Sequence, residues 1–269
     1  MRLFIGYALM PEGLRGLTPD ELEMWIPPKV DTIISDYILP VQGVLGIYGM
    51  EGSYKSLLMI DLMYKIATGQ DWFGFKTNMT STYYFQTEIP QAMLQQRSRA
   101  YRIGNRMNTK NCWLATDLYL KIDKGSGSTL METELARTNP GLLIVDPLNT
   151  SISGNMNEEY DSGVAIDRFN MWRKNYKIAM VLIHHPRKQE HVEGQVFHYG
   201  TDEWGGSGRW KKWMDSIIYL ELVNNGDPYV DLKLTFEKTR HSHIKLNPFG
   251  VRLDRRTLVF ERAELAGTL

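Results

Sequence analysis

The sequence has a single cysteine, Cys112, and no apolar run long enough to cross a bilayer. One cysteine excludes an intramolecular disulfide and favours a reducing compartment. A membrane-spanning helix needs about 18 consecutive apolar residues, so we expect no membrane partner. The first ten residues hold only a short apolar patch, which we interpret as mature sequence and not as a signal peptide. These absences favour a cytoplasmic protein.

Net charge is absent as well, because 31 basic and 31 acidic side chains cancel over the 269 residues. A hydrophobic content of 43% with 23% charged residues is ordinary for a globular protein and excludes wholesale disorder. The charges are unevenly spread, however. Residues 1–40 carry three basic and six acidic side chains, whereas residues 233–262 carry eight basic and three acidic ones. The basic C-terminal third permits an anionic partner without proving one.

Residues 41–269 alternate between strand-like and helix-like segments, whereas residues 1–40 lack a strong strand pattern. We interpret 1–40 as an N-terminal arm with a short helix near Pro19–Trp25, entered through Thr18. The alternation predicts strands over 44–48, 82–86, 142–145 and 178–183, with one or two more within 112–122, and helices over 55–68, 90–103, 128–137 and 157–174. Consecutive strands then follow over 215–222, 229–238, 251–254 and 257–261. The fold expected for 41–269 is therefore an α/β, doubly wound, mainly parallel sheet with a C-terminal antiparallel extension.

The segment between the first strand and its helix is Gly49-Met50-Glu51-Gly52-Ser53-Tyr54-Lys55-Ser56. It matches the phosphate-binding pattern G-x-x-x-x-G-K-[ST] except at Tyr54, where the pattern has glycine. Backbone N–H groups in such a turn, together with the dipole of the following helix, attract an anion. We therefore expect ATP to bind here, with Lys55 reaching the β- and γ-phosphates and Ser56 ligating Mg²⁺. The alternative is a strand-to-helix turn that binds nothing.

Two acidic residues follow other strand-like runs. Asp146 ends the apolar run 142–145, a pattern that holds Mg²⁺ in nucleotide hydrolases. Glu88 follows the strand over 82–86, and ligands bind at the carboxyl edge of an open α/β sheet. Both residues also have a purely structural interpretation. A buried strand followed by aspartate is common, and a carboxylate before Pro90 is favourable at a helix N-terminus.

The order of these segments resembles the RecA-like ATPases, and more narrowly the branch of plasmid RepA-type hexameric replicative helicases and related phage ATPases. The matching segments are Gly49–Ser56, Phe85–Glu88, Ile144–Leu148, Ile183–Lys188, Gly206-Ser207 and Lys238–Arg240. The resemblance covers roughly residues 40–250 and extends the expected fold to a RecA-like domain over 41–269. It implies ATP and Mg²⁺ as ligands. It also implies that the working assembly is a homo-oligomeric ring, which in that branch is a hexamer.

The resemblance also implies a role for each matching polar residue. Glu88 takes the place of the acid that activates the attacking water, and His184 or His185 that of the group that senses the γ-phosphate. Lys238 and Arg240 take the place of the cations that reach the neighbouring subunit's nucleotide. These two residues lie two apart on a late strand and so share one face. A solvated surface pair is the alternative interpretation.

Nucleic-acid contacts are expected from Arg187 and Lys188 and from Arg209, Lys211 and Lys212. Residues 187–204 stand where the resemblance places a DNA-binding loop, although acidic residues are mixed with the basic ones. The nearby Trp204, Trp210 and Trp213 either stack on bases or pack a helix on the sheet. The histidines and Cys112 match no structural zinc pattern, and no G-x-S-x-G elbow supports a serine hydrolase.

The sequence therefore predicts an ATP-hydrolysing RecA-like motor, with a replicative helicase on single-stranded DNA as the favoured function. A replication initiator or loader is an expected further partner, because the sequence lacks the N-terminal domain of typical two-domain helicases. Two alternatives remain open. One is a recombinase-type filament on single-stranded DNA, and the other is an ATP-gated regulatory or assembly switch that does not bind DNA.

Overall fold

The computed structural model describes residues 16–26, 31–186, 191–192, 195–196 and 204–264, in two compact units, residues 1–31 and 32–269. The first unit contains helix α1 (Pro19–Met24). The Thr18 hydroxyl accepts a hydrogen bond from the Glu21 amide, and the Glu21 side chain accepts one from the Thr18 amide. This capping box is the reason the helix begins where the sequence predicts.

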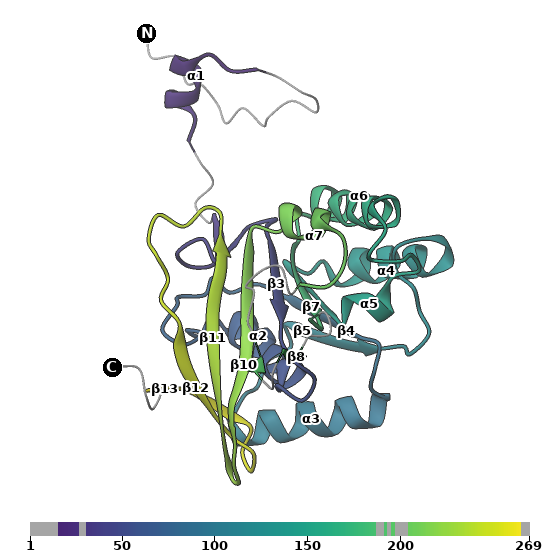
Figure 1. Cartoon of the computed structure of the whole chain (residues 1–269). Helices are drawn as coiled ribbons and strands as arrows, with labels where there is room; N and C mark the ends of the chain where they lie inside the picture. Colours follow the sequence, from purple (N-terminus) through teal and green to yellow (C-terminus); the bar gives the residue numbers. More distant parts are fainter. Residues whose placement is uncertain (1–15, 27–30, 187–190, 193–194, 197–203, 265–269) are drawn as a thin grey trace. The chain divides into compact units, whose positions relative to one another are not determined.

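The second unit is built on a sheet that has nine strands among the described residues, in the order β13-β12-β11-β10-β3-β7-β6-β4-β5 (Figure 1). Its strands are β3 (Val44–Tyr48), β4 (Thr82–Gln86), β5 (Cys112–Thr116), β6 (Leu142–Asp146), β7 (Ala179–His184), β10 (Ser216–Asn225), β11 (Tyr229–Thr239), β12 (Phe249–Asp254) and β13 (Val259–Ala263). Pairing is parallel from β10 through β5 and antiparallel from β10 through β13. The predicted α/β fold, with a mainly parallel sheet and an antiparallel C-terminal extension, is confirmed.

Helices cover both faces of this sheet. Helices α2 (Lys55–Thr68) and α3 (Gln91–Gly104) bury side chains such as Leu58 and Tyr101 against one face. Helices α4 (Gly125–Thr138), α6 (Glu159–Tyr176) and α7 (Gly208–Trp213) bury Leu135, Phe169 and Trp210 against the other. Figure 1 shows α4, α6 and α7 grouped together, away from α3. Because both faces are covered, the central strands are buried along their whole length, which explains the apolar runs in β3, β6 and β7.

Several short elements had no sequence signal. They are β1 (Thr32–Ile34), β2 (Leu39–Pro40), α5 (Leu148–Ser151), β8 (His191–Val192) and β9 (Gln195–Val196). β1 pairs with β2, so the second unit begins with paired strands inside the stretch that showed no strong strand pattern. Segments of two to four residues are too short to display a period. No helix in the described ranges is long and apolar enough to span a bilayer.

Candidate functional site

The phosphate-binding pattern forms the turn between the carboxyl end of β3 and the start of α2. Its first glycine is required by a close neighbour, since a Cβ on Gly49 would lie 2.2 Å from the Leu220 carbonyl oxygen of β10. Gly52 has φ of +78°, in the left-handed region that glycine adopts freely. The sequence interpretation of 49–54 as a strand-to-helix turn is confirmed.

Tyr54, the departure from the pattern, has φ of 62° and ψ of 19° and occupies the N-cap position of α2. A left-handed conformation costs a residue with a Cβ about 1–2 kcal/mol. Two side chains contact the Tyr54 phenol. Arg255 donates a hydrogen bond of 2.6 Å to the hydroxyl, which donates in turn to Asn225 Oδ1 at 3.1 Å. The Arg255 guanidinium also lies 5.7 Å from the ring centroid, in cation–π geometry.

Lys55 is buried and turned onto its own loop. Its Nζ donates to the carbonyl oxygens of Gly49 (2.6 Å) and Met50 (2.7 Å). Burial lowers the pKa of the Lys55 ammonium to about 8, although Asp146, Glu88 and Glu51 favour the charged form. The ammonium also donates to the Ser53 hydroxyl at 3.3 Å. These three partners inside the loop are neutral, and an anionic phosphate would be a stronger partner.

Asp146 ends β6 and is buried, and two hydroxyl groups contact it. The Tyr84 hydroxyl of β4 donates a 2.6 Å hydrogen bond to Asp146 Oδ2, and the Ser56 side chain lies close enough to lower the pKa of this carboxylate. Burial raises the pKa of Asp146, while the Tyr84 and Ser56 side chains oppose that rise. A hydroxyl and a carboxylate so close together provide the hard oxygen ligands that Mg²⁺ prefers. The donor set therefore fits the Mg²⁺ role expected of Ser56 and Asp146.

Glu88 lies directly after β4, and its side chain is exposed. Its backbone N–H donates to the side-chain oxygen of Gln86, which fixes the turn. His185 Nε2 lies 3.8 Å from Glu88 Oε1, so the two residues form one polar pair at the carboxyl edge. Strand order places Glu88 at the same edge of the sheet as the phosphate loop. β7 and β6 lie between β3 and β4, and all four parallel strands end at that edge.

His184 differs sharply from its neighbour, although the sequence offered both as γ-phosphate sensors. It is 7% exposed, and its ring centroid lies 5.2 Å from that of Trp204. Burial lowers the pKa of His184 to about 3, so the ring is neutral at physiological pH. Its Nδ1 is buried and has no hydrogen-bond partner among the described residues. His184 therefore lies in the wall of the site, whereas His185 lies beside Glu88.

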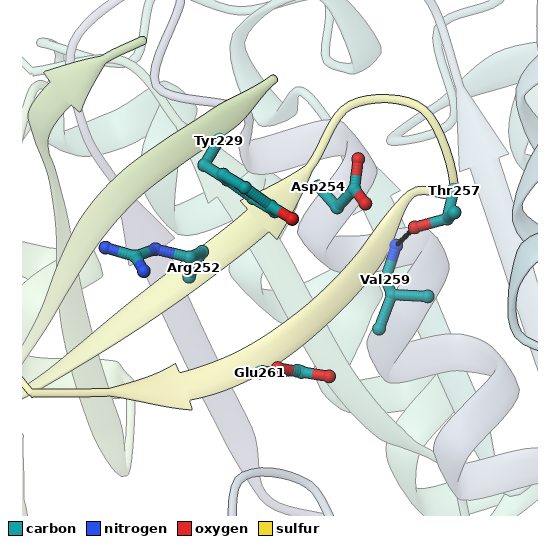
Figure 2. A pocket seen from close by; sticks show the side chains of 6 residues that line it. All are labelled: Tyr229, Arg252, Asp254, Thr257, Val259 and Glu261. Atoms are coloured by element: carbon teal, nitrogen blue, oxygen red, sulfur yellow. Dashed lines mark hydrogen bonds between the residues drawn. The ribbon is translucent and has the colours of Figure 1, made fainter. Parts of the chain in front are cut away.

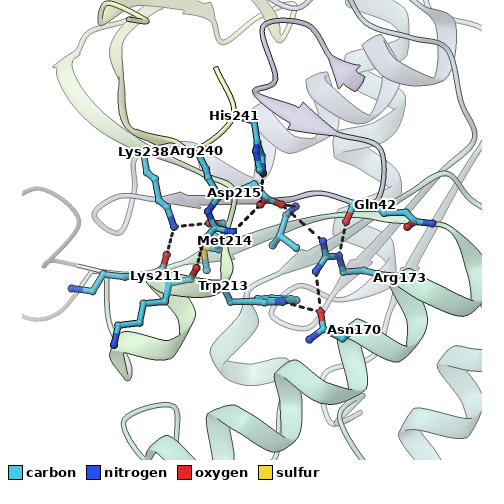
Figure 3. Close-up of polar contacts among 12 residues, drawn as sticks. Gln42, Asn170, Arg173, Lys211, Trp213, Met214, Asp215, Lys238, Arg240 and His241 are labelled. Carbon is cyan, nitrogen blue, oxygen red and sulfur yellow. Dashed lines mark hydrogen bonds and ion pairs between the residues drawn. The ribbon is translucent and has the colours of Figure 1, made fainter. Parts of the chain in front are cut away.

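Lys238 and Arg240 lie at the opposite edge of the sheet from the phosphate loop. The end of β11 pairs with the start of β10, beside the amino end of β3. Lys238 donates 2.6 Å hydrogen bonds to the carbonyls of Lys211 and Met214, and Arg240 contacts the Lys212 carbonyl and, at 3.2 Å, Asp215 (Figure 3). Both side chains thus reach the same segment, as their spacing of two predicts. Burial and the nearby Arg240 lower the pKa of Lys238.

Asp215 is the centre of this cluster and was not singled out as a site residue by the sequence. Its Oδ2 accepts from the Val44 amide at 2.9 Å, and its Oδ1 lies 3.1 Å from His241 Nε2 (Figure 3). The Arg173 guanidinium lies 4.0 Å away and also donates to the Gln42 carbonyl. Asp215 directly precedes β10, and it joins the start of β3 to Arg240 and His241, which directly follow β11.

The expected nucleic-acid residues are only partly described. Arg187 and Lys188 lie outside the described residues. Arg209 is on α7, 4.0 Å from Glu159. The Lys211 and Lys212 carbonyls accept from Lys238 and Arg240, respectively. Of the three tryptophans, Trp204 and Trp210 are almost fully buried. The packing alternative is therefore correct for them, and base stacking by these two is excluded.

The C-terminal extension carries a separate surface hollow of about 200 Å³ (Figure 2). It is lined by Tyr229, Arg252, Asp254, Thr257, Val259 and Glu261. Two of its charged residues are already paired, since Arg252 binds Asp231 and Asp254 binds Arg256. This hollow is part of the packing of β11–β13 and does not add a group to the phosphate loop.

A profile of the protein family described as "AAA domain" matches residues 11–191. The chain belongs to this family. Its members are RecA-like P-loop ATPases, and membership implies nucleotide binding, typically with Mg²⁺. No curated protein matches the chain.

Among solved structures, a KaiC-like protein from the hyperthermophilic archaeon Pyrococcus horikoshii has a similar fold. The TM-score is 0.55 at 12% sequence identity, over 88% of this chain and 95% of that one. At this identity the likeness concerns the fold alone. It agrees with the RecA-like architecture of residues 32–269.

Proposed function

We propose that this AAA-domain protein hydrolyses ATP at the interfaces of a homo-oligomer. The observation that carries the proposal is the division of charged groups between two edges of one sheet. Lys55, Ser56, Asp146 and Glu88 lie at the carboxyl edge, whereas Lys238 and Arg240 lie beside the amino end of β3. A complete site then needs the amino edge of one subunit beside the carboxyl edge of the next. Such a head-to-tail contact generates a ring or a filament.

Within one subunit, the environment of each site residue supports a role in binding or hydrolysing ATP. The loop amides of 49–54 and the Lys55 ammonium would bind the phosphates, and Ser56 and Asp146 would hold Mg²⁺. Bound Mg²⁺ neutralises phosphate charge. Glu88 is exposed beside His185 and available to take a proton from water. The buried, neutral His184 is less suited to a sensing role than His185, which faces the same edge as Glu88.

In this proposal Lys238 and Arg240 add positive charge to the phosphate loop of the neighbouring subunit. β3 spans five residues, roughly 16 Å, which separates these cations from the phosphate loop of the same chain. In the proposed assembly they neutralise charge on the neighbour's nucleotide. An arginine supplied in this way is worth roughly 10³–10⁵ in rate in other nucleotide hydrolases.

We propose that ATP hydrolysis drives translocation on single-stranded DNA, as in the RepA-type replicative helicases. The proposed motor is a hexameric ring, and a replication initiator or loader assists it. Two basic segments of the surface support this proposed contact with DNA. Residues 89–116 hold five basic side chains and no acidic one, and Arg99, Arg102 and Arg106 on or just after α3 are exposed. None of these three arginines makes an ion pair with another described residue. Arg209, Lys211 and Lys212 form a second basic segment at α7.

ATPase assays with and without single-stranded DNA test the proposal. We expect DNA to stimulate hydrolysis and the stimulation to fall steeply with salt, because phosphate contacts release counterions. Arg99→Glu/Arg102→Glu and Lys211→Glu/Lys212→Glu identify which basic segment contacts DNA. Hydrolysis without any response to DNA at low salt favours the regulatory switch. Electron microscopy with an ATP analogue separates a ring from a recombinase-type filament.

A further inference from the structure

The antiparallel extension reaches the phosphate loop. Tyr219 of β10 pairs with Tyr48, the last residue of β3, and β10 then continues six residues to Asn225. At about 3.3 Å per residue, this carries the β10–β11 hairpin roughly 20 Å beyond the end of β3. Figure 1 shows this hairpin extending past the neighbouring strands. It therefore passes beside the loop and brings Asn225 to Tyr54.

The turn between β12 and β13 is held against the same region. The Arg255 amide donates to the Pro228 carbonyl at 3.0 Å, which ties this turn to the β10–β11 hairpin. Asn105, after α3, donates to the Leu258 carbonyl at 3.3 Å. Gly104 packs so closely on the turn that a Cβ there would lie 1.7 Å from the Thr257 carbonyl oxygen. The backbone at Arg255 is therefore held both by the β10–β11 hairpin and by the end of α3.

We propose that Arg255 and Asn225 are positioning residues for the phosphate loop, and that they act through Tyr54. The three side chains form what we call the Tyr54 brace. The usual glycine adopts the left-handed conformation without a steric penalty, whereas tyrosine does not. The two hydrogen bonds to the phenol and the cation–π contact with Arg255 hold Tyr54 in that conformation. The amides that follow it are then aligned for phosphate before nucleotide arrives. This inference rests on the nucleotide site proposed above.

A mutant cycle tests the brace with wild type, Arg255→Ala, Tyr54→Gly and the double variant. The first readout is the Kd for a fluorescent, non-hydrolysable ATP analogue with Mg²⁺. We expect Arg255→Ala to weaken binding roughly tenfold when Tyr54 is present. We expect the same substitution to have almost no effect in the Tyr54→Gly background, because glycine needs no support there. If Arg255 only stabilised the fold, Tyr54→Gly would not restore the affinity that Arg255→Ala removes.

Three further variants sharpen the result. Arg256→Ala is the matched control, since Arg256 lies in the same turn but pairs with Asp254 and Tyr229. It should leave the affinity unchanged in both backgrounds. Arg255→Lys keeps the charge and should lie between wild type and Arg255→Ala. Asn225→Ala should weaken binding in the same background-dependent way as Arg255→Ala.

The second readout is the urea midpoint of unfolding without nucleotide. We expect Arg255→Ala to lower this midpoint more with Tyr54 than with glycine at that position. Equal losses of affinity in both backgrounds, or no loss in either, would overturn the brace. If wild type binds the analogue but neither hydrolyses ATP nor responds to DNA, the proposed function fails while the brace stands. If wild type does not bind the analogue, both are wrong.

Discussion

The Tyr84 hydroxyl donates a 2.6 Å hydrogen bond to Asp146 Oδ2, inside the sheet and next to Ser56. Tyr84 and Ile144 are register partners on β4 and β6, so the phenol reaches the end of β6 from two residues back. This contact orients a carboxylate that is otherwise raised in pKa by burial. Tyr84 had no motif signal in the sequence, and this contact places it beside the proposed Mg²⁺ site.

Tyr84→Phe should weaken Mg²⁺ activation of the ATPase. Loss of an outer partner of a metal ligand typically costs 10–100-fold in metal affinity, so we expect the half-saturating Mg²⁺ concentration to rise about tenfold. The hydrogen bond favours the charged carboxylate, and its removal therefore raises the pKa of Asp146 further. The acid limb of the rate profile should move to higher pH. An unchanged Mg²⁺ titration and pH profile would contradict this role.

Lys55→Met should abolish ATP hydrolysis and leave the fold intact. It should also change how stability depends on pH. Because the pKa of Lys55 falls from 10.5 to about 8 in the folded protein, the unfolded chain holds more protons between these values. The free energy of unfolding of wild type, relative to Lys55→Met, should then rise with pH across this window, by at most about 3 kcal/mol. Urea titrations of nucleotide-free protein at pH 7.5–10.5 measure this difference.

Glu88→Gln should bind ATP with Mg²⁺ but hydrolyse it at least ~10²-fold more slowly, because the amide cannot accept the proton of water. Equilibrium binding and single-turnover hydrolysis separate the two effects. Glu159→Gln is a suitable control, since Glu159 is an exposed acid at the start of α6. Turnover near the wild-type rate would mean that Glu88 serves only the start of α3.

Arg240→Ala should remove ATPase activity by roughly 10³-fold or more and retain nucleotide binding. Asp215 keeps its contacts with Val44 and His241 in this variant, so the sheet should remain intact. Mixing Arg240→Ala with inactive Lys55→Ala should restore partial activity, because some interfaces then combine an intact loop with an intact arginine. If mixed oligomers form and remain inactive, the cations serve only the Asp215 cluster.

The local elements were largely predictable from the sequence. β3, α2 and β4 have the predicted bounds, because burial on two faces leaves continuous apolar runs and helices show a period near four. The turn 49–54 was also predictable, since glycine, lysine and serine at fixed spacing are local features. The family match over residues 11–191 agrees with the RecA-like resemblance.

The environment of each site residue could not be predicted in this way. His184 and His185 are adjacent in sequence, yet one is buried against Trp204 and the other lies beside Glu88. Tyr54 and Arg255 are 201 positions apart, and Tyr84 and Asp146 are 62 apart. Such contacts depend on strand order and on how far each hairpin extends. The periodicity of a sequence shows which side of an element is buried, but not which element packs against it. For that reason the Tyr54 brace and the Asp215 cluster could be found only in the tertiary structure.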